Sequence, residues 1–429
     1  MSSALLSSLR AGDHDGALAA LYALDGAQSS LDRARDRACR TAGNLMKTFA
    51  PSGAAVLFSG PGRTEIGGNH TDHQHGRVLC GSVDMDMLAC AAPNGKNVIR
   101  IQSEGYPALE VELEELAVRP GEANTSAALV RGVAARVREL GYSLTGFDAC
   151  VTSTVLSGSG LSSSAAYEVL VGNILNRFSC GGALDAVTIA KIGQYAENVY
   201  FGKPCGLMDQ MGSSVGGAVA IDFANPADPV VEKVDYDFSQ SGHALCIVDT
   251  VSSHGDLTGD YAAVTQEMGA VAAHFGRSVL REVPEDNFRA ELPALRKACG
   301  DRAVLRALHF YDDDRRAVQE AQALKDGDFG RFLTLVNASG RSSSLHLQNT
   351  WSTADPRQQA IPVVLALGAE LLEGQGAIRV HGGGFAGTVQ AFVPNNMLEG
   401  FRSGMEGLLG AGTCHVLYIR PQGGCVVAE

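Results

Sequence analysis

Two carboxylates near the middle of the chain are the first residues that could support catalysis. Glu197 lies near the end of a predicted helix and Asp209 in a following turn, within AENVYFGKPCGLMDQ. Taken alone, each residue would more often cap a helix or face solvent. Phosphoryl transfer, however, uses one carboxylate to hold Mg²⁺ and another to orient or deprotonate an alcohol. The pair therefore favours this chemistry, provided that a phosphate site lies nearby.

A segment rich in glycine and serine upstream of the pair is typical of a phosphate site. The residues VLSGSGLSSSAAYEVL (155–170) occupy a predicted strand-to-helix junction. Gly158 and Gly160 permit a tight turn, and Ser162, Ser163 and Ser164 are predicted to cap the next helix. Free amides at a helix N-terminus bind phosphate. A Walker A loop is excluded because its Gly-Lys-Ser/Thr sequence is absent, and an ordinary capped helix is the alternative.

A third candidate is the polar loop PGRTEIGGNHTDHQHG (61–76), which lies between two predicted strands. Short polar side chains interleaved with glycine suit a polyhydroxylated ligand, since each hydroxyl needs a fixed donor or acceptor. A solvated loop and a zinc site are the alternatives. Zinc is disfavoured because the histidines have no helical i, i+4 spacing and no cysteine partner. The candidate residues are Arg63, Glu65, Asn69, His70, Asp72, His73 and His75.

Successive glycines also mark the segment HGGGFAGTVQAFV (381–393), between two late predicted strands. Gly382, Gly383 and Gly384 cost backbone entropy, which indicates an unusual backbone path or a close approach to a ligand or neighbouring loop. A flexible hairpin is the alternative. The chain holds 51 glycines in 429 residues, about 12% against a usual value of about 7%, without a Gly-X-Y period.

Composition narrows the classes of protein that this chain can belong to. The net charge of −13 argues against binding to nucleic acid or anionic membranes, which requires clustered positive charge. Hydrophobic residues make up 45%, enough for a packed core. The ten cysteines show no C-x-x-C spacing and are expected to be reduced, mostly buried thiols. With neither a signal peptide nor a membrane span predicted, we expect a soluble, cytoplasmic protein.

The pattern of elements predicts an α+β chain with a sheet in each half. Residues 1–30 are predicted to form a short helical extension, and 31–49 an amphipathic helix. Short apolar runs between 54 and 118 predict strands, and 123–140, 162–178 and 184–199 predict helices. The turn-rich segment 225–242 is the best candidate for a domain boundary. We therefore expect an extension (1–30), an N-terminal domain (31–238) and a C-terminal domain (239–429).

These motifs, in this order, resemble the galactokinases of the GHMP small-molecule kinase superfamily over most of residues 50–429. The resemblance implies a two-domain fold, with a ribosomal-protein-S5-like N-terminal domain and a ferredoxin-like C-terminal domain. It also implies ATP-dependent phosphorylation of the anomeric hydroxyl of a monosaccharide, with Mg²⁺ as the metal. Monosaccharide and ATP would be the partners, without nucleic acid or membrane. A monomer is expected, and a dimer is left open.

The resemblance implies a role for each motif residue. Arg63 would stabilise the transferring phosphoryl group, and Asp209 would accept or orient the hydroxyl proton. Ser164 and Glu197 would be Mg²⁺ ligands, and Gly382, Gly383 and Gly384 would belong to a loop that closes over the site. Sugar binding is implied for Glu65, Asn69, His70, Asp72 and Tyr261. ATP binding is implied for Gly158, Ser159, Gly160, Leu161, Ser162, Ser163 and Ser164.

The sequence departs from the family pattern in three places, of which the first leaves the choice of sugar open and the second the choice of nucleotide base; no function is assigned to the third. The family's N-L-I-G-E-H-x-D-Y reads here as E-I-G-G-N-H-T-D-H (65–73), so that Asn69 replaces a sugar-binding glutamate. Ser126 stands where the family has a tryptophan that stacks on adenine, and the late E-S-H segment has become NASGRSSSLHLQN (337–349). Galactose is the leading substrate. A uronic acid, a pentose or an amino sugar is the alternative, followed by a catalytically silent sugar sensor.

Overall fold

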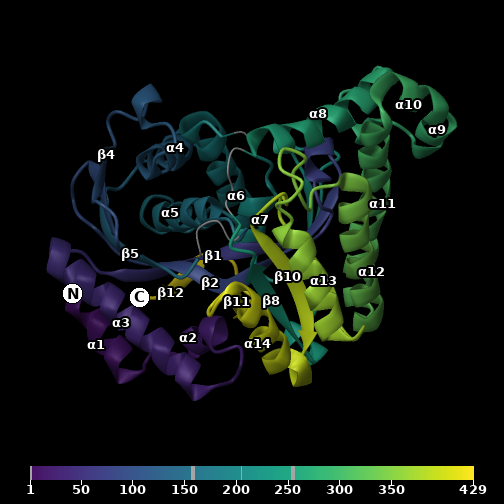
Figure 1. Cartoon of the computed structure of the whole chain (residues 1–429). Helices are drawn as coiled ribbons and strands as arrows, with labels where there is room; N and C mark the ends of the chain where they lie inside the picture. Colours follow the sequence, from purple (N-terminus) through teal and green to yellow (C-terminus); the bar gives the residue numbers. More distant parts are fainter. Residues whose placement is uncertain (1, 156–159, 204, 253–256) are drawn as a thin grey trace.

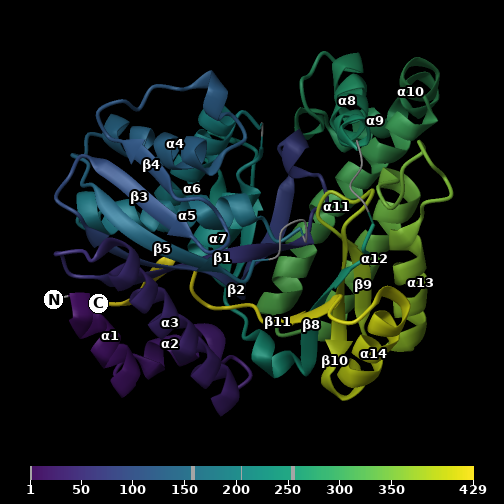
Figure 2. The ribbon, with the colours of Figure 1, turned by 60° about the vertical axis from the view of Figure 1, so that its left-hand side comes forward.

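Two β-sheets, each covered by helices, lie side by side and form the framework of the molecule (Figure 1). The computed structural model describes residues 2–155, 160–203, 205–252 and 257–429. The two ends of the chain lie next to each other at one edge (Figure 2). The predicted mixture of helices and strands, with a sheet in each half, is confirmed.

The larger sheet has the strand order β12-β1-β2-β5-β3-β4, and β6 pairs with both β2 and β7. Within the described ranges its neighbours are antiparallel, except for the parallel pair β3 and β5. Its strands are β1 (Val56–Gly67), β2 (Arg77–Pro93), β3 (Val98–Ser103), β4 (Leu109–Glu112), β5 (Phe147–Ser153), β6 (Ala218–Asp222), β7 (Val230–Val234) and β12 (Cys425–Ala428).

Alternating side chains of this sheet supply two separate cores. Leu57 and Leu88 pack with the first three helices, whereas Phe58 and Ala89 pack with helices on the opposite face, as the period of two in a strand requires. The first layer is α1 (Ser2–Ala11), α2 (Asp15–Tyr22) and α3 (Gln28–Phe49). The opposite layer includes α4 (Ser126–Glu139), α5 (Ser163–Ser179), α6 (Ala186–Tyr195) and the π-helix η3 (Ala196–Phe201).

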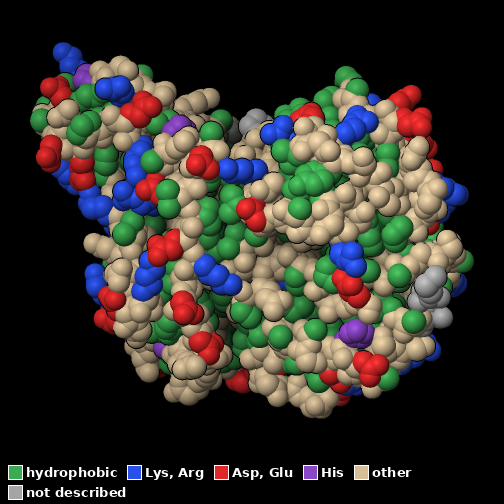
Figure 3. Space-filling view, turned by 180° about the vertical axis from the view of Figure 1, so that it is seen from behind, with side chains coloured by type: hydrophobic (Ala, Val, Ile, Leu, Met, Phe, Trp, Pro, Cys, Tyr) green, Lys and Arg blue, Asp and Glu red, His purple; other side chains and the backbone are tan. Residues whose placement is uncertain are grey.

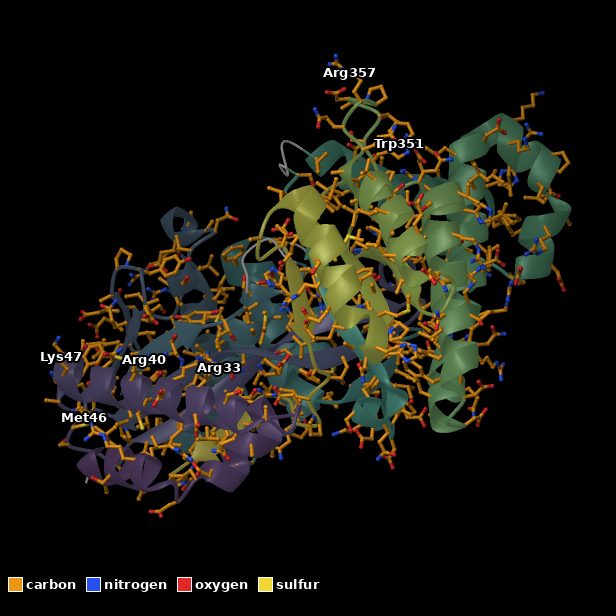
Figure 4. All side chains as sticks on the ribbon, turned by 60° about the horizontal axis from the view of Figure 1, so that its bottom comes forward. Arg33, Arg40, Met46, Lys47, Trp351 and Arg357 are labelled. Atoms are coloured by element: carbon orange, nitrogen blue, oxygen red, sulfur yellow. The ribbon has the colours of Figure 1, made fainter. Side chains whose placement is uncertain are left out.

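The N-terminal extension is thus an integral layer of the fold. Arg37 of α3 pairs with the buried Asp86 of β2 at 2.5 Å, and Tyr22 donates to the same carboxylate at 2.6 Å. Arg33, Arg40 and Lys47 are exposed, and Figure 4 shows them along α3.

The smaller sheet is antiparallel, with the order β11-β8-β10-β9. Its strands are β8 (His243–Asp249), β9 (Ala377–His381), β10 (Thr388–Pro394) and β11 (Cys414–Leu417). A largely helical stretch, predicted between 258 and 372, separates β8 from β9. The helices of this half are α8 (Thr258–His274), α9 (Glu285–Ala290), α10 (Leu292–Cys299), α11 (Asp301–Lys325), α12 (Phe329–Ser342), the π-helix η6 (Ser343–Leu347), α13 (Ala360–Leu372) and α14 (Leu398–Leu409).

Three strands depart from the sequence analysis. Strand β1 includes residues 61–67, which were predicted to belong to a polar loop. The turn-rich segment 225–242 contains β7, which pairs with β6 and extends the larger sheet. Strand β12, which was not predicted, pairs with β1, so the end of the chain returns from the smaller sheet to the larger one. The boundary between two domains at residue 238 stays a proposal. Strand β12 lies after this boundary in the sequence, but it belongs to the sheet of the first domain.

The thiols, the surface charges and the helices are the features that composition led us to predict. All ten cysteines are free thiols in the described part of the chain, and six of them are buried, as predicted. The face seen in Figure 3 mixes basic and acidic side chains, without a broad region of one sign. Among the described residues, none of the helices combines the length and apolar character that crossing a membrane would require.

Candidate active site

A cavity of about 260 Å³ lies between the larger sheet and the helices and loop of the second half. Its walls bring together most of the residues predicted to bind sugar, although they come from parts of the chain more than 300 residues apart. The residues lining it are Arg63, Glu65, His70, Asp72, His73, Lys203, Cys205, Gly206, Met208, Asp209, Tyr261, Gly382 and Gly383.

Arg63 and Asp209, the two residues that were predicted to be catalytic, contact each other on one side of this cavity. Asp209 is the second residue of α7 (Met208–Val215). Its Oδ1 accepts a hydrogen bond from Arg63 Nε at 2.7 Å and forms an ion pair with Arg63, with Nη2 at 2.6 Å. The Asp209 side chain keeps 27% of its surface exposed, so it faces the cavity. Burial alone would raise the pKa of Asp209, but Arg63 and the Ser162 hydrogen bond outweigh it and lower the pKa. Asp209 is therefore an ionised carboxylate.

The Ser162 side chain binds this carboxylate and does not cap the helix that follows it. Its hydroxyl donates to Asp209 Oδ2 at 2.7 Å, and it makes no side-chain capping bond to α5. The prediction that Ser162 caps the helix is therefore wrong. Residue 162 has a left-handed backbone (φ 56°), which directs its side chain toward α7.

The rest of the predicted phosphate loop surrounds the start of α5. Gly158 and Ser159 lie outside the described residues. Gly160 has φ 73°, and its carbonyl accepts a hydrogen bond from Arg63; Leu161 is buried, with its carbonyl 3.0 Å from the Arg63 amide. Ser163 is the first residue of α5, whose leading amides have no partner within the helix. This positive helix end is a suitable position for phosphate oxygens.

The predicted metal ligands are the second residue of α5, Ser164, and Glu197 of the π-helix η3. Ser164 donates to Glu197 Oε1 at 3.0 Å, and Gln210 links Glu197 and Glu168 with bonds of 2.8 and 2.9 Å. Glu197 and Glu168 are buried, and Glu168 Oε1 has no hydrogen-bond partner among the described residues. A hydroxyl, a carboxylate and an unpartnered buried oxygen beside the predicted phosphate site fit Mg²⁺, which prefers oxygen ligands and is usually bound by one or two carboxylates together with substrate phosphates.

His70 and Asp72 both line the cavity. Burial and the neighbouring His73 lower the pKa of His70 to about 4, so its imidazole is neutral. Its Nε2, 2.9 Å from the Gly383 carbonyl, must then carry the proton and donate. Within the described ranges, no group of three or more histidine, cysteine or acidic side chains is arranged to hold a metal ion.

The three glycines that were predicted to form a closing loop accept hydrogen bonds from residues that were predicted to bind sugar. The carbonyls of Gly382, Gly383 and Gly384 accept hydrogen bonds from Asn69 at 2.8 Å, His70 at 2.9 Å and Tyr261 at 2.9 Å, in that order. A Cβ at Gly383 would lie 2.5 Å from the Tyr261 ring, so only glycine fits. The predicted close approach to a neighbouring element is confirmed.

Glu65 and Asn69 occupy different positions relative to the cavity. Glu65, on β1, lines the wall and forms an ion pair of 2.7 Å with the buried Arg379 of β9. Burial raises the pKa of Glu65 to about 7, although Arg379 opposes the shift. Asn69 has no exposed surface and lies behind the wall. Its predicted contact with sugar therefore has no geometric support in this structure.

Sequence reasoning missed two basic residues at this site. Lys203 lines the cavity, with Nζ 3.4 Å from Glu197. Its position in the sequence between Glu197 and Asp209 could have indicated that it belongs to the site. Arg379 reaches Glu65 from the other sheet, and no local pattern could have linked the two. Trp351 does not line the cavity; Figure 4 shows it on the loop before α13.

Comparisons with known proteins agree with this geometry. Residues 46–93 match the galactokinase galactose-binding signature, and residues 128–217 match the GHMP kinases N terminal domain. A galactokinase of Streptomyces coelicolor is 32% identical over 339 residues, which cover 79% of this chain and 84% of that protein.

Solved structures show the same fold at lower identity. The galactokinase of Lactococcus lactis, crystallised with galactose, superposes with a TM-score of 0.75 at 22% identity, covering 89% of this chain and 98% of that one. The Methanococcus jannaschii mevalonate kinase gives a TM-score of 0.60 at 15% identity, covering 86% and 99%. The fold is therefore that of the GHMP kinases. The match to the Streptomyces enzyme over most of both chains shows that this chain belongs to the galactokinase family.

Proposed function

We propose that this protein transfers the γ-phosphoryl group of ATP to the anomeric hydroxyl of galactose, giving galactose 1-phosphate and ADP. The observation that carries the proposal is the ionised Asp209, held by Arg63 and Ser162 on the wall of a cavity that the sugar-loop residues complete. The family membership and the galactose-binding signature support the same reaction.

Asp209 would orient the C1 hydroxyl and receive its proton. Its lowered pKa makes it a weak base, so the proton would move late, as the oxygen bonds to phosphorus and the bond to ADP breaks. Such a base suffices, because phosphoryl transfer depends mainly on positioning and charge stabilisation. Arg63 contacts Asp209 and the Gly160 carbonyl, and its guanidinium would lie beside the transferring group.

Phosphate binding would rely on the start of α5 and on Mg²⁺. The amides at the helix N-terminus would bind the ATP phosphates, with Ser164 and Glu197 as the protein ligands of the metal. Bound Mg²⁺ would neutralise part of the charge that develops on the phosphoryl oxygens. The hydrogen bond of 3.0 Å between Ser164 and Glu197 supports this assignment, because one metal ion could contact both oxygens.

The test is a panel of sugars assayed with ATP and Mg²⁺. Galactose, galactosamine, galacturonate, arabinose and glucose are each incubated with the protein, and ADP release is followed together with the ³¹P spectrum of the product. We expect galactose to give the highest kcat/KM and a phosphate on C1. Faster turnover of another sugar would overturn the choice of galactose, and the absence of turnover with any sugar would favour a silent sensor.

A further inference from the structure

Asn69 uses all of its hydrogen-bonding capacity within the protein. Its Nδ2 donates to Glu65 Oε1 at 2.9 Å and to the Gly382 carbonyl at 2.8 Å. Its Oδ1 accepts from Ser343 Oγ at 3.1 Å and Asn349 Nδ2 at 2.8 Å. A primary amide has two donor hydrogens and two lone pairs, so none is left for a ligand. Asn69 is also fully buried and absent from the cavity wall.

These partners explain two departures from the family pattern together. Ser343 and Asn349 belong to the segment 337–349, to which the sequence analysis gave no role, and both donate to Asn69. An amide is required here, because the position must donate twice and accept twice. An ionised carboxylate at residue 69 could only accept, and would place lone pairs against the Gly382 carbonyl and the Glu65 carboxylate.

Glu65, unlike Asn69, uses only one of its two side-chain oxygens within the described part of the protein. Its Oε1 accepts from both Asn69 and Arg379, whereas no described residue donates to Oε2. Since Glu65 lines the cavity, Oε2 is available to a ligand. Relative to the family pattern N-L-I-G-E, the amide and the carboxylate have exchanged positions along the chain. The carboxylate thus stands on strand β1, at the cavity wall, and the amide behind it.

We propose that Asn69 is a positioning residue, which fixes the Glu65 carboxylate and the Gly382 carbonyl, and that Glu65 is the carboxylate that accepts a hydrogen bond from a sugar hydroxyl. This inference rests on the proposed sugar-kinase function. It also narrows the substrate class. Three carboxylates, those of Glu65, Asp72 and Asp209, line the cavity with two basic side chains, and both basic side chains are already paired with protein carboxylates. A neutral sugar is therefore favoured over a uronic acid.

The test compares Asn69→Asp with the double variant Asn69→Asp/Glu65→Gln. In Asn69→Asp the side chain keeps almost the same shape, but it loses the hydrogen-bond donor to the Gly382 carbonyl and places a second carboxylate beside Glu65. We expect the KM for galactose to rise about 10- to 100-fold, as for one or two lost buried hydrogen bonds, with the KM for ATP within about twofold. The double variant removes the repulsion between the two carboxylates, so Tm should recover in part, whereas the KM for galactose should stay raised because residue 65 no longer supplies a carboxylate.

A matched control isolates the cost of burying a carboxylate. Asn173 of α5 is also buried, and its Nδ2 donates to the Val169 carbonyl at 2.8 Å, away from the cavity. Asn173→Asp should lower Tm without raising the KM for galactose. If Asn69→Asp does not fold, Ser343→Ala removes one donor to Asn69, and the KM for galactose should rise about two- to fivefold.

The outcomes separate this inference from the proposed function. Galactose binding is measured independently of turnover, by calorimetry and by the ligand-induced shift in Tm. Wild-type protein that binds galactose without turning it over would overturn the proposed function alone. An unchanged galactose affinity in folded Asn69→Asp, or in Ser343→Ala if the first variant fails to fold, would overturn the role of Asn69. Preference for galacturonate over galactose in wild-type protein would overturn the role of Glu65.

Discussion

Replacing Asp209 with asparagine should remove most of the turnover while leaving nucleotide binding nearly intact. The ionised carboxylate is paired with Arg63, accepts hydrogen bonds from Arg63 Nε and Ser162, and has its exposed edge toward the cavity. An amide at residue 209 can still accept from Arg63 through its oxygen, but it cannot receive a proton. General-base catalysis contributes about 10²- to 10⁴-fold, so we expect kcat to fall by that factor, equivalent to about 2.7–5.5 kcal/mol.

The same substitution should lower stability only moderately. Arg63 is left without its charged partner, which costs about 3–5 kcal/mol for a fully buried pair. The 27% exposure of Asp209 and the remaining contact of Arg63 with the Gly160 carbonyl reduce this cost to about 1–3 kcal/mol. Folding is followed by thermal denaturation, turnover by ADP release and nucleotide affinity by calorimetry.

Asp222→Asn is a suitable control for the loss of charge. The Asp222 side chain has a similar exposure of 28% and pairs with Arg77 and Arg281, but it does not line the cavity. The control should lose stability and keep its kcat. If Asp209→Asn retains a kcat within tenfold of the wild type, Asp209 does not act as the base.

Three further perturbations test other parts of the site. Glu197→Gln should raise the Mg²⁺ concentration needed for half-maximal turnover at least tenfold, and an unchanged requirement in a Mg²⁺ titration would exclude Glu197 as a ligand. Because the pKa of Glu65 is raised to about 7, kcat/KM for galactose should fall as the pH drops through 7 and the carboxylate takes up a proton. That decrease should be absent in Glu65→Gln, and identical pH profiles would contradict the role of this carboxylate. Gly383→Ala should raise the KM for galactose, because the new Cβ would lie 2.5 Å from the Tyr261 ring and displace the closing loop; unchanged steady-state kinetics would show that the loop tolerates it.

The sequence predicted the motifs of the site better than their partners. Glu197 and Asp209 could be singled out because phosphoryl transfer uses two carboxylates, whereas the roles of Arg63 and Ser164 were implied only by the resemblance to galactokinases. The structure places Arg63 in contact with Asp209 and Ser164 in contact with Glu197. The hydroxyl of Ser162 shows the limit of such reasoning, since a serine before a helix indicates a cap, whereas its actual partner comes from a different helix.

The departures at residues 65 and 69 were visible in the sequence, but their meaning was not. Their role depends on Arg379, Ser343 and Asn349, which lie some 270 to 310 residues further along the chain. Nothing in the local pattern selects those partners. Strand β12 was missed for a similar reason, because its pairing with β1 is decided by the return of the chain to the first sheet.

The central claim is that the cavity binds galactose and presents its C1 hydroxyl to Asp209. The most direct measurement is the ³¹P spectrum, with proton coupling, of the product formed from galactose, ATP and Mg²⁺ by the wild-type protein and by Asp209→Asn. The account predicts a sugar phosphate coupled to the anomeric proton in the first case and at most about one-hundredth of its rate of formation in the second. A phosphate on any other carbon, or equal rates for the two proteins, would contradict it.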